Sequence, residues 1–442
     1  MKRGPAALVV FAWLLAASAA RADDEKRTTP DYDGRPSPPP SPGEVALWVP
    51  RVVLFPVYVV TEYLIRRPLG AVMTAAERGN WATTLVDFFT FGPDHKAGLI
   101  PTAFFDFGFQ PSVGAYFFWN DAFVRGHDLR LHASYFGSDW LAVSASDRWH
   151  VGAKSRVSLD ARWVRRPDYV YYGEGARTVQ QSESRFLMDT LDVGPSADLA
   201  LGGGLSYRAQ VGARSVYFRD SQYGKDPSVS DEARAGVFAT PAGYGSGYTD
   251  VYERLTLAFD SRPALPSSQS GVRAVAHAEH GNDVSQARGP SWIKYGASLG
   301  GAVDLWRDRV LSLSVAGELA DPIGGGAIPF TEEAVWGGVE PLSGFLPGRL
   351  HGRSAAAATL VYTWPIWVWL EGRMSVAVGN AFDVGFRDFD PKLLRLSSGI
   401  GIQSTGSADH RLEIILGLGT ETFDQRAKVD SFRLAIGGTN GF

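Results

Sequence analysis

The feature that most constrains the fold is an alternation of apolar residues with polar or small ones, which fills the chain from about Leu99 to its end. From Leu412 to Leu418 every second residue is leucine or isoleucine, and Arg411 and Glu413 belong to the opposite face. The runs LEGRMSVAV and LSLSVAG repeat the pattern. A period of two is that of a β-strand with two different faces. The alternation predicts an all-β protein, and it fits a soluble sandwich as well as a membrane barrel.

The number of alternating segments and the lengths of their connections favour the barrel. The sixteen segments span 101–109, 112–120, 128–136, 139–149, 156–172, 184–193, 198–213, 248–260, 272–281, 292–306, 309–320, 355–364, 367–379, 393–404, 410–420 and 431–440. Bacterial outer-membrane barrels have even strand numbers, short periplasmic turns and long external loops. Here the connections after even-numbered strands are short, such as GPSA at 194–197 and TGSAD at 405–409, whereas those after odd-numbered strands include 214–247 and 321–354. We expect a 16-stranded antiparallel transmembrane β-barrel over residues 98–442.

Composition agrees with a barrel. Hydrophobic residues make up 45% of the chain and charged residues 20%, which excludes a bundle of membrane-spanning helices. The 50 glycines and 13 tryptophans suit the small inward residues and the aromatic girdles of a membrane barrel. The formal net charge of −4 offers no global basic surface, so we expect no nucleic-acid partner. We expect no cofactor either.

The chain begins with the features of an exported protein. Lys2 and Arg3 precede an apolar run and an A-x-A site that ends at Ala22, which predicts a signal peptide over 1–22. Residues 23–44 include PSPPPSP and are predicted to be a proline-rich disordered linker. Residues 45–97 follow as an apolar N-terminal helical segment. Because Pro50 and Pro56 interrupt its apolar stretch at 45–69, we favour short helices docked on the barrel or membrane surface over a spanning helix.

The last segment has the outward face that a closing strand needs. In SFRLAIGGTNGF, Phe432, Leu434 and Ile436 share one face, and the chain ends at Phe442. A last strand that pairs with the first leaves no open sheet edge in lipid. A terminal aromatic residue resembles the signal by which barrel proteins are recognised for assembly. These features predict a protein of the outer membrane of a Gram-negative bacterium.

Five segments carry a resemblance to a known family, and they occur in the family's order. The segments are YYGEG (171–175), FDSRPALPSSQSG (259–271), IPFTEEAVWGG (328–338), LRLSSGIGIQ (394–403) and FRLAIGGT (432–439). They resemble the Y-G-x-G loop entry, the D-x-R periplasmic turn, the P-F-x-E-x-x-x-x-G-G lid entry, the S-x-G-I-G strand and the closing strand of the bacterial surface antigen barrels, the BamA/TamA assembly-factor superfamily. The five segments span residues 171–439.

The resemblance implies that the loop at about 321–354 folds back into the lumen as a lid. Gly337 and Gly338 would permit tight turns there, and Ser343, Gly344 and Phe345 would form its tip. In the family an arginine of the tip pairs with an aspartate on the inner wall. Alignment places Ser343 at that arginine and Ala377 at that aspartate. Both members of the family's ion pair are therefore absent. Their joint loss is physically consistent, because either charge alone would be costly to bury without its partner.

Two arginines of the same loop offer a replacement. Arg349 and Arg353 follow the tip, whereas Glu371 and Arg373 belong to the inward face of a nearby strand. We hypothesise that Arg349 or Arg353 pairs with Glu371. The alternative is that both loop arginines are solvated.

Function is expected to follow the family with one departure. Residues 23–98 show no pattern for POTRA modules, so the chain resembles a POTRA-less member. We expect a barrel that assists insertion or translocation of proteins or lipids. Its expected partners are outer-membrane lipids, the barrel-assembly machinery and unknown protein or lipid clients. The alternative is a plugged or narrow pore, or a structural barrel without insertase activity.

An enzymatic role is not expected. Ser298 lies in a G-x-S-x-G sequence, but inside an alternating strand rather than at a strand-to-helix turn. His277 and Glu279 fall on the face opposite to His280, which argues against a zinc site.

Overall fold

The computed structural model describes residue 84 and residues 87–221, 223–262, 270–286, 289–306, 308–338, 341–367, 370–405 and 410–440. The expected signal peptide, proline-rich linker and apolar stretch at 45–69 lie outside these residues. Within them, no helix is long and apolar enough to cross a membrane.

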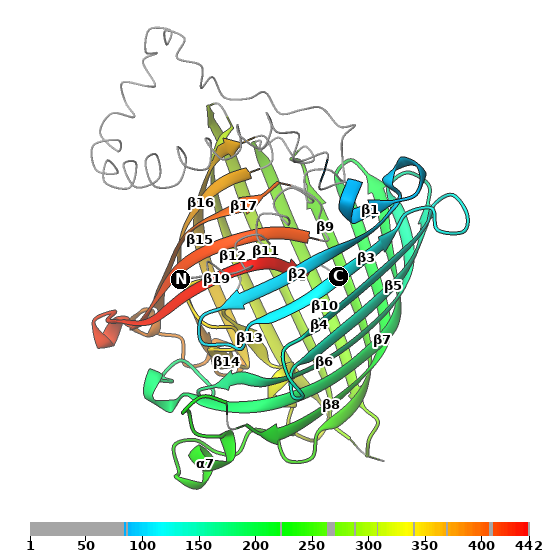
Figure 1. The fold of residues 1–442 in the computed structure, drawn as a ribbon. Coiled ribbons are helices and arrows are strands. Elements are labelled where there is room, and N and C mark those ends of the chain that lie inside the picture. The colour runs from blue at the N-terminus through cyan, green and yellow to red at the C-terminus, as the bar shows by residue number, and fades with distance from the viewer. Residues whose placement is uncertain are drawn as a thin grey trace, which may run out of the picture.

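Sixteen long antiparallel strands form a closed barrel, which confirms the expected fold (Figure 1). The strands are β2 (Ala97–Asp106), β3 (Ser112–Trp119), β4 (His127–Tyr135), β5 (Leu141–Val151), β6 (Ser155–Tyr171), β7 (Ser184–Gly202), β8 (Leu205–Asp220), β9 (Tyr248–Asp260), β10 (Gly271–Asp283), β11 (Ser291–Trp306), β12 (Arg309–Ile323), β15 (Ser354–Trp367), β16 (Leu370–Phe382), β17 (Arg395–Ser404), β18 (His410–Thr422) and β19 (Val429–Asn440). Each strand pairs with its neighbours in sequence, and β19 pairs with β2 to close the sheet.

Long connections and tight turns lie at opposite ends of the barrel, as the sequence predicts. The long connections carry η3 (Gln180–Ser182), α7 (Val229–Arg234), η4 (Phe330–Glu332), β13 (Ala334–Trp336), β14 (Leu350–Gly352), η5 (Val384–Phe386), η6 (Pro391–Leu393) and η7 (Phe423–Gln425). A two-residue strand β1 (Thr90–Phe91) and η2 (Pro93–His95) precede the barrel. We call the end with the long connections the loop end and the other the turn end.

One expected turn is wrong. The sequence predicts GPSA between two strands, but Gly194 and Pro195 lie inside β7 and pair with Asp160 and Leu159 of β6. On the other side, the ladder between β7 and β8 omits these two residues. A Cβ at Gly194 would lie 2.1 Å from the carbonyl oxygen of Val211. The glycine therefore lets β8 approach closely, and the real turn follows Gly202.

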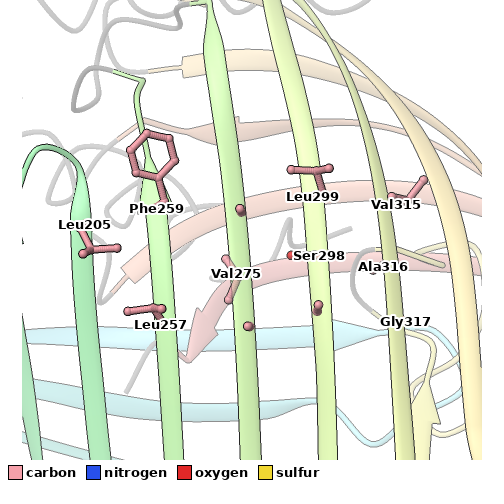
Figure 2. A pocket seen from close by; sticks show the side chains of 12 residues that line it. Leu205, Leu257, Phe259, Val275, Ser298, Leu299, Val315, Ala316 and Gly317 are labelled. Atoms are coloured by element: carbon pink, nitrogen blue, oxygen red, sulfur yellow. The ribbon is translucent and has the colours of Figure 1, made fainter.

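The outer wall is apolar and uneven. Leu255, Leu299 and Leu313 are exposed on this face, as lipid contact requires. Across β9–β12 the wall has a shallow hollow of about 500 Å³. Alanines and glycine make its floor, and Leu257, Phe259, Leu299 and Val315 stand at its sides (Figure 2). The small outward residues of β10 and β11 thus lower the surface between larger neighbours.

Candidate functional site: the lid and the seam

The connection between β12 and β15 enters the barrel, and we call residues 324–353 the lid. Its two short strands, β13 and β14, pair with each other and lie within the outline of the barrel (Figure 1). Ser343, Gly344 and Phe345, the lid tip, are buried, and Phe345 is 0% exposed. The segment expected to be a lid therefore lies against the inner wall.

The lid tip is held by serine side chains of β17 and β19. The Gly344 N–H donates to Oγ of Ser397 in β17 at 2.8 Å. The Ser431 hydroxyl, in β19, donates to the Gly344 carbonyl oxygen at 3.1 Å. The backbone of the tip is thus bonded on both sides to the wall near the end of the chain.

Glycines make this close approach possible. A Cβ at Gly344 would lie 2.1 Å from the carbonyl oxygen of Leu418. On the wall, a Cβ at Gly417 would lie 2.9 Å from Cα of Gly344, and one at Gly419 would lie 2.5 Å from the Phe345 ring. No side chain fits at these distances. The inner face of β18 therefore has a bare patch that receives the tip.

Apolar packing surrounds the tip. Leu342, Phe345 and Leu350 of the lid form a buried cluster with wall alanines that include Ala377. Ala377 is the position where the resembling family would carry an aspartate. A charged carboxylate in this cluster would need a cation. Here the wall contributes a methyl group instead, and Ser343 contributes no charge.

Gly337 and Gly338 form the turn at which the chain leaves β13 toward the lid tip. Their φ angles are +120° and +81°, in the region that favours glycine. The Gly338 N–H donates to the carbonyl oxygen of Phe345 at 2.8 Å. This bond connects the two arms of the lid at the tip.

The root of the lid is attached to the opposite wall, and sequence reasoning missed this attachment. Glu332 lies 2.8 Å from Nη2 of Arg214 in β8, and the Tyr248 hydroxyl donates to Glu332 at 2.5 Å. Arg214 also contacts Asp250 and Glu279 on the neighbouring strands. Glu332 belongs to the quoted PFTE sequence, but its partner could not be inferred from strand parity alone.

Aromatic residues reinforce the root. Phe330 is fully buried in a cluster with Tyr171, Phe186 and Tyr244. Its ring centroid lies 5.4 Å from those of both Tyr171 and Phe186. The lid therefore spans the lumen, with its root on β6–β9 and its tip on β17–β19.

The hypothesis that Arg349 or Arg353 pairs with Glu371 is wrong. Arg349 donates to Thr178 Oγ1 at 2.8 Å and lies over the Tyr172 ring at 4.2 Å. The Arg353 side chain donates to the carbonyl oxygen of Ala320 at 2.8 Å. Glu371 accepts a hydrogen bond from Gln403. The alternative of solvated arginines is also wrong for Arg349, which is 1% exposed.

The physical reason is distance along the strand. Arg353 precedes Ser354, which pairs with Phe382 at the loop end of β16. Glu371 lies eleven residues away at the turn end of the same strand. At the rise of a β-strand this separates the two by about 35 Å. Arg373 lies near Glu371, on the inner surface beside Gln403 and Glu413, and is likewise remote from the lid.

The contact between the first and last barrel strands, which we call the seam, is short. Among the described residues, β19 and β2 form three residue pairs, Ala435 with Asp106, Ile436 with Phe105 and Gly437 with Phe104. By comparison, β2 and β3 form eight pairs. The Phe107 N–H adds one bond to the Leu434 carbonyl oxygen at 2.8 Å.

Pro101 explains part of this shortness. Phe107 directs its N–H to β19, and Lys96 directs its carbonyl to the β3 side, where the Asn120 N–H bonds it. Odd-numbered residues of β2 therefore face the seam. Pro101 is one of them and has no N–H to donate. Further along the same edge, β1 pairs with Gly98 and Ala97, so the edge is occupied at both ends.

A buried ion pair crosses the seam at its loop end. Nη2 of Arg433 in β19 lies 2.9 Å from Oδ2 of Asp106 in β2, and Nε lies 3.1 Å from both carboxylate oxygens. Asp106 is 2% exposed. The sequence held a signal for this site, because the outward Phe432 and Leu434 imply that Arg433 faces the lumen.

The residues considered for catalysis or metal binding are dispersed. Ser298 lies within β11, paired with Ala316 and Val275 of the adjacent strands. His277 lies 3.6 Å from Glu318, and His280 lies 3.6 Å from Glu253. Across the part of the chain that the structure describes, no three histidine, cysteine or acidic residues are grouped to hold a metal ion.

Among comparisons with known proteins, similarity to a solved barrel supports the fold. No protein-family model matches the chain, and no curated protein sequence matches it. BamA from Haemophilus ducreyi, solved without POTRA domains 1–3, is similar with a TM-score of 0.54 at 14% identity, over 78% of this chain and 70% of that one. CdiB from Acinetobacter baumannii gives 0.48 at 12% identity, over 78% of this chain and 59% of that one. CdiB from Escherichia coli gives 0.49 at 11% identity, over 79% and 64%. The described residues have the fold of a BamA-type outer-membrane β-barrel.

Proposed function

We propose that this barrel resides in a bacterial outer membrane and assists the insertion or translocation of proteins or lipids by opening at the seam. The observation that carries the proposal is the three-pair contact between β2 and β19. A barrel in lipid must satisfy its backbone groups internally, and the shortest ladder is the least costly to separate. Pro101, which has no N–H to donate, limits the length of this ladder, and Gly437 allows β19 to approach β2 closely within it.

The lid directs this proposal toward a lateral route. Its root is bound to β8 and β9 and its tip to β17–β19, so it crosses the lumen near the loop end. A client that used the lumen would have to displace these buried contacts. A client that used the seam would separate two strands and enter the bilayer directly.

A second candidate function is a plugged structural barrel. The contacts that favour it are those of the lid itself, because both its root and its tip are buried. In this case the lid would remain in place and the seam would remain closed. We propose lipids of the outer membrane, together with the barrel-assembly machinery, as partners in either case, and we propose no enzymatic activity.

Depletion in the native host tests the two functions. We expect the census of other outer-membrane proteins and surface lipids to change on depletion and to recover with the wild-type chain. Phe105→Cys and Ile436→Cys, which replace an aligned pair across the seam, allow the seam to be crosslinked. The crosslinked double variant should fail to restore the census, and each single variant should restore it. An unchanged census after depletion favours the structural barrel.

A further inference from the structure

We infer that the lid tip and the seam form one coupled unit, joined by Arg433. The inference rests on the proposed opening of the seam but names the device that controls it. Arg433 contributes to both parts, because the guanidinium that binds Asp106 across the seam also donates from Nη1 to the carbonyl oxygen of Ser343 at 3.4 Å.

The chemistry of arginine suits this double role. A guanidinium has five N–H donors in a planar fork, so it can bind a carboxylate through one edge and still donate from the remaining nitrogen. Here Nε and Nη2 face the carboxylate and Nη1 faces the lid. Arg433 and Asp106 are both buried. If one of these side chains moved away, the charge of the other would therefore be poorly solvated by water.

The lid also contacts both sides of the seam by packing. On the β19 side, Ser431 bonds Gly344, and Gly419 of β18 lies under the Phe345 ring. On the β2 side, Leu346 packs in a cluster with Phe109, which follows β2 in the chain. At the neighbouring Gly108, a Cβ would lie 3.7 Å from the Leu346 side chain.

Because of these contacts, closure of the seam depends on whether the lid tip is seated. With the tip seated, residues 343–346 join β19 to the start of the β2–β3 connection, and Arg433 is fixed by the Ser343 carbonyl in the geometry that binds Asp106. Without the tip, the seam retains its three-residue ladder and an arginine that has lost one of its partners. Displacement of the lid therefore favours separation of β2 from β19, and separation of the strands loosens the lid.

A crosslinking assay on the purified full chain in lipid vesicles tests the coupling. The chain contains no cysteine, so Phe105→Cys with Ile436→Cys places two reactive thiols on aligned residues of the closed seam. A short bifunctional thiol reagent then reports the closed fraction as an initial crosslinking rate. Protease cleavage within 324–353 reports the lid, and the shift of gel mobility on boiling confirms that each variant is folded.

The informative variants leave the seam strands unchanged. Gly419→Val and Gly417→Val insert side chains where the Phe345 ring and the Gly344 backbone lie. We expect both to increase lid cleavage and to lower the crosslinking rate about tenfold, which corresponds to about 1.4 kcal/mol. Gly301→Val is the matched control, because nothing lies within 4 Å of a Cβ at that position of β11.

Arg433→Gln tests the junction from the other side. We expect slower crosslinking together with faster lid cleavage, because one side chain holds both parts. Normal crosslinking in Gly419→Val and Gly417→Val would overturn the coupling, and so would an Arg433→Gln chain whose lid remains as protected as the wild type. The assay contains no client, so its outcome is independent of whether the barrel inserts proteins or lipids.

Discussion

Glu332 at the root of the lid lies 2.8 Å from Arg214 on the inner wall of β8. The resembling family carries an arginine on its lid and an acid on its wall, whereas this ion pair has the opposite polarity and a different place. The acid belongs to the lid, and the arginine belongs to the wall. The root of the lid therefore has an ion pair in which the lid supplies the acid and the wall supplies the arginine.

Loss of Arg214 should free the lid root and destabilise the barrel. Arg214 contacts three carboxylates, Asp250, Glu279 and Glu332, which are all buried. Arg214→Gln would leave them without this cation, at a cost of about 3–5 kcal/mol. We expect faster lid proteolysis and a lower temperature for the boiling-dependent mobility shift. Glu332→Gln should loosen the lid more mildly, because the amide oxygen of the new side chain can still accept from Tyr248. Equal protection in the wild type and Arg214→Gln would contradict this account.

Substitution of Gly437 should open the seam directly. Its φ is +151°, and a Cβ would lie 2.7 Å from the Ala103 carbonyl oxygen in β2. A branched side chain would separate the strands at one of their three pairs. We expect Gly437→Val to lower crosslinking between cysteines at positions 105 and 436, whereas Gly301→Val should not. A wild-type crosslinking rate in Gly437→Val would show that β2 accommodates the valine without separating from β19.

Replacement of Pro101 should have the opposite effect. Valine at this position supplies a seam-facing N–H and suits an extended strand, so the ladder between β2 and β19 can lengthen. We expect slower backbone amide exchange in β2 and β19 and faster crosslinking across the seam. Client insertion, if the proposed function holds, should decrease. Pro195→Ala in β7, far along the wall, serves as the control. Amide exchange as fast as in the wild type would refute this role for Pro101.

The lid should loosen as pH rises. Burial, and then the nearby Glu174 carboxylate, raises the pKa of Glu333 from 4.5 to about 9. The folded lid therefore favours the protonated acid, while the released segment ionises near 4.5. This contribution to lid stability is fully present below about pH 4.5 and is lost as pH rises toward 9. Lid proteolysis should increase over that window, and Glu333→Gln should flatten its pH dependence. A profile identical to that of the wild type would exclude Glu333 as the cause.

The sequence predicted the strands well because their alternation is a local property. Inward and outward positions can be counted along each run, and this parity correctly assigned Ala377 and Phe432 to their faces. The method failed at GPSA, since a Gly-Pro pair resembles a turn unless the neighbouring ladder is known. The predicted pairing of Arg349 or Arg353 with Glu371 also failed. Strand parity tells whether a side chain faces the lumen, but it does not tell how far along the barrel axis the residue lies.

The sequence by itself therefore determined a barrel of sixteen strands with a glycine-bearing lid, since periodicity and loop length are written along the chain. The tertiary structure decided which residues meet: Glu332 with Arg214, Ser343 with Arg433, and Arg433 with Asp106. These partners are separated by about 90 to 330 residues. Only the register of closure and the path of the lid through the lumen bring them together.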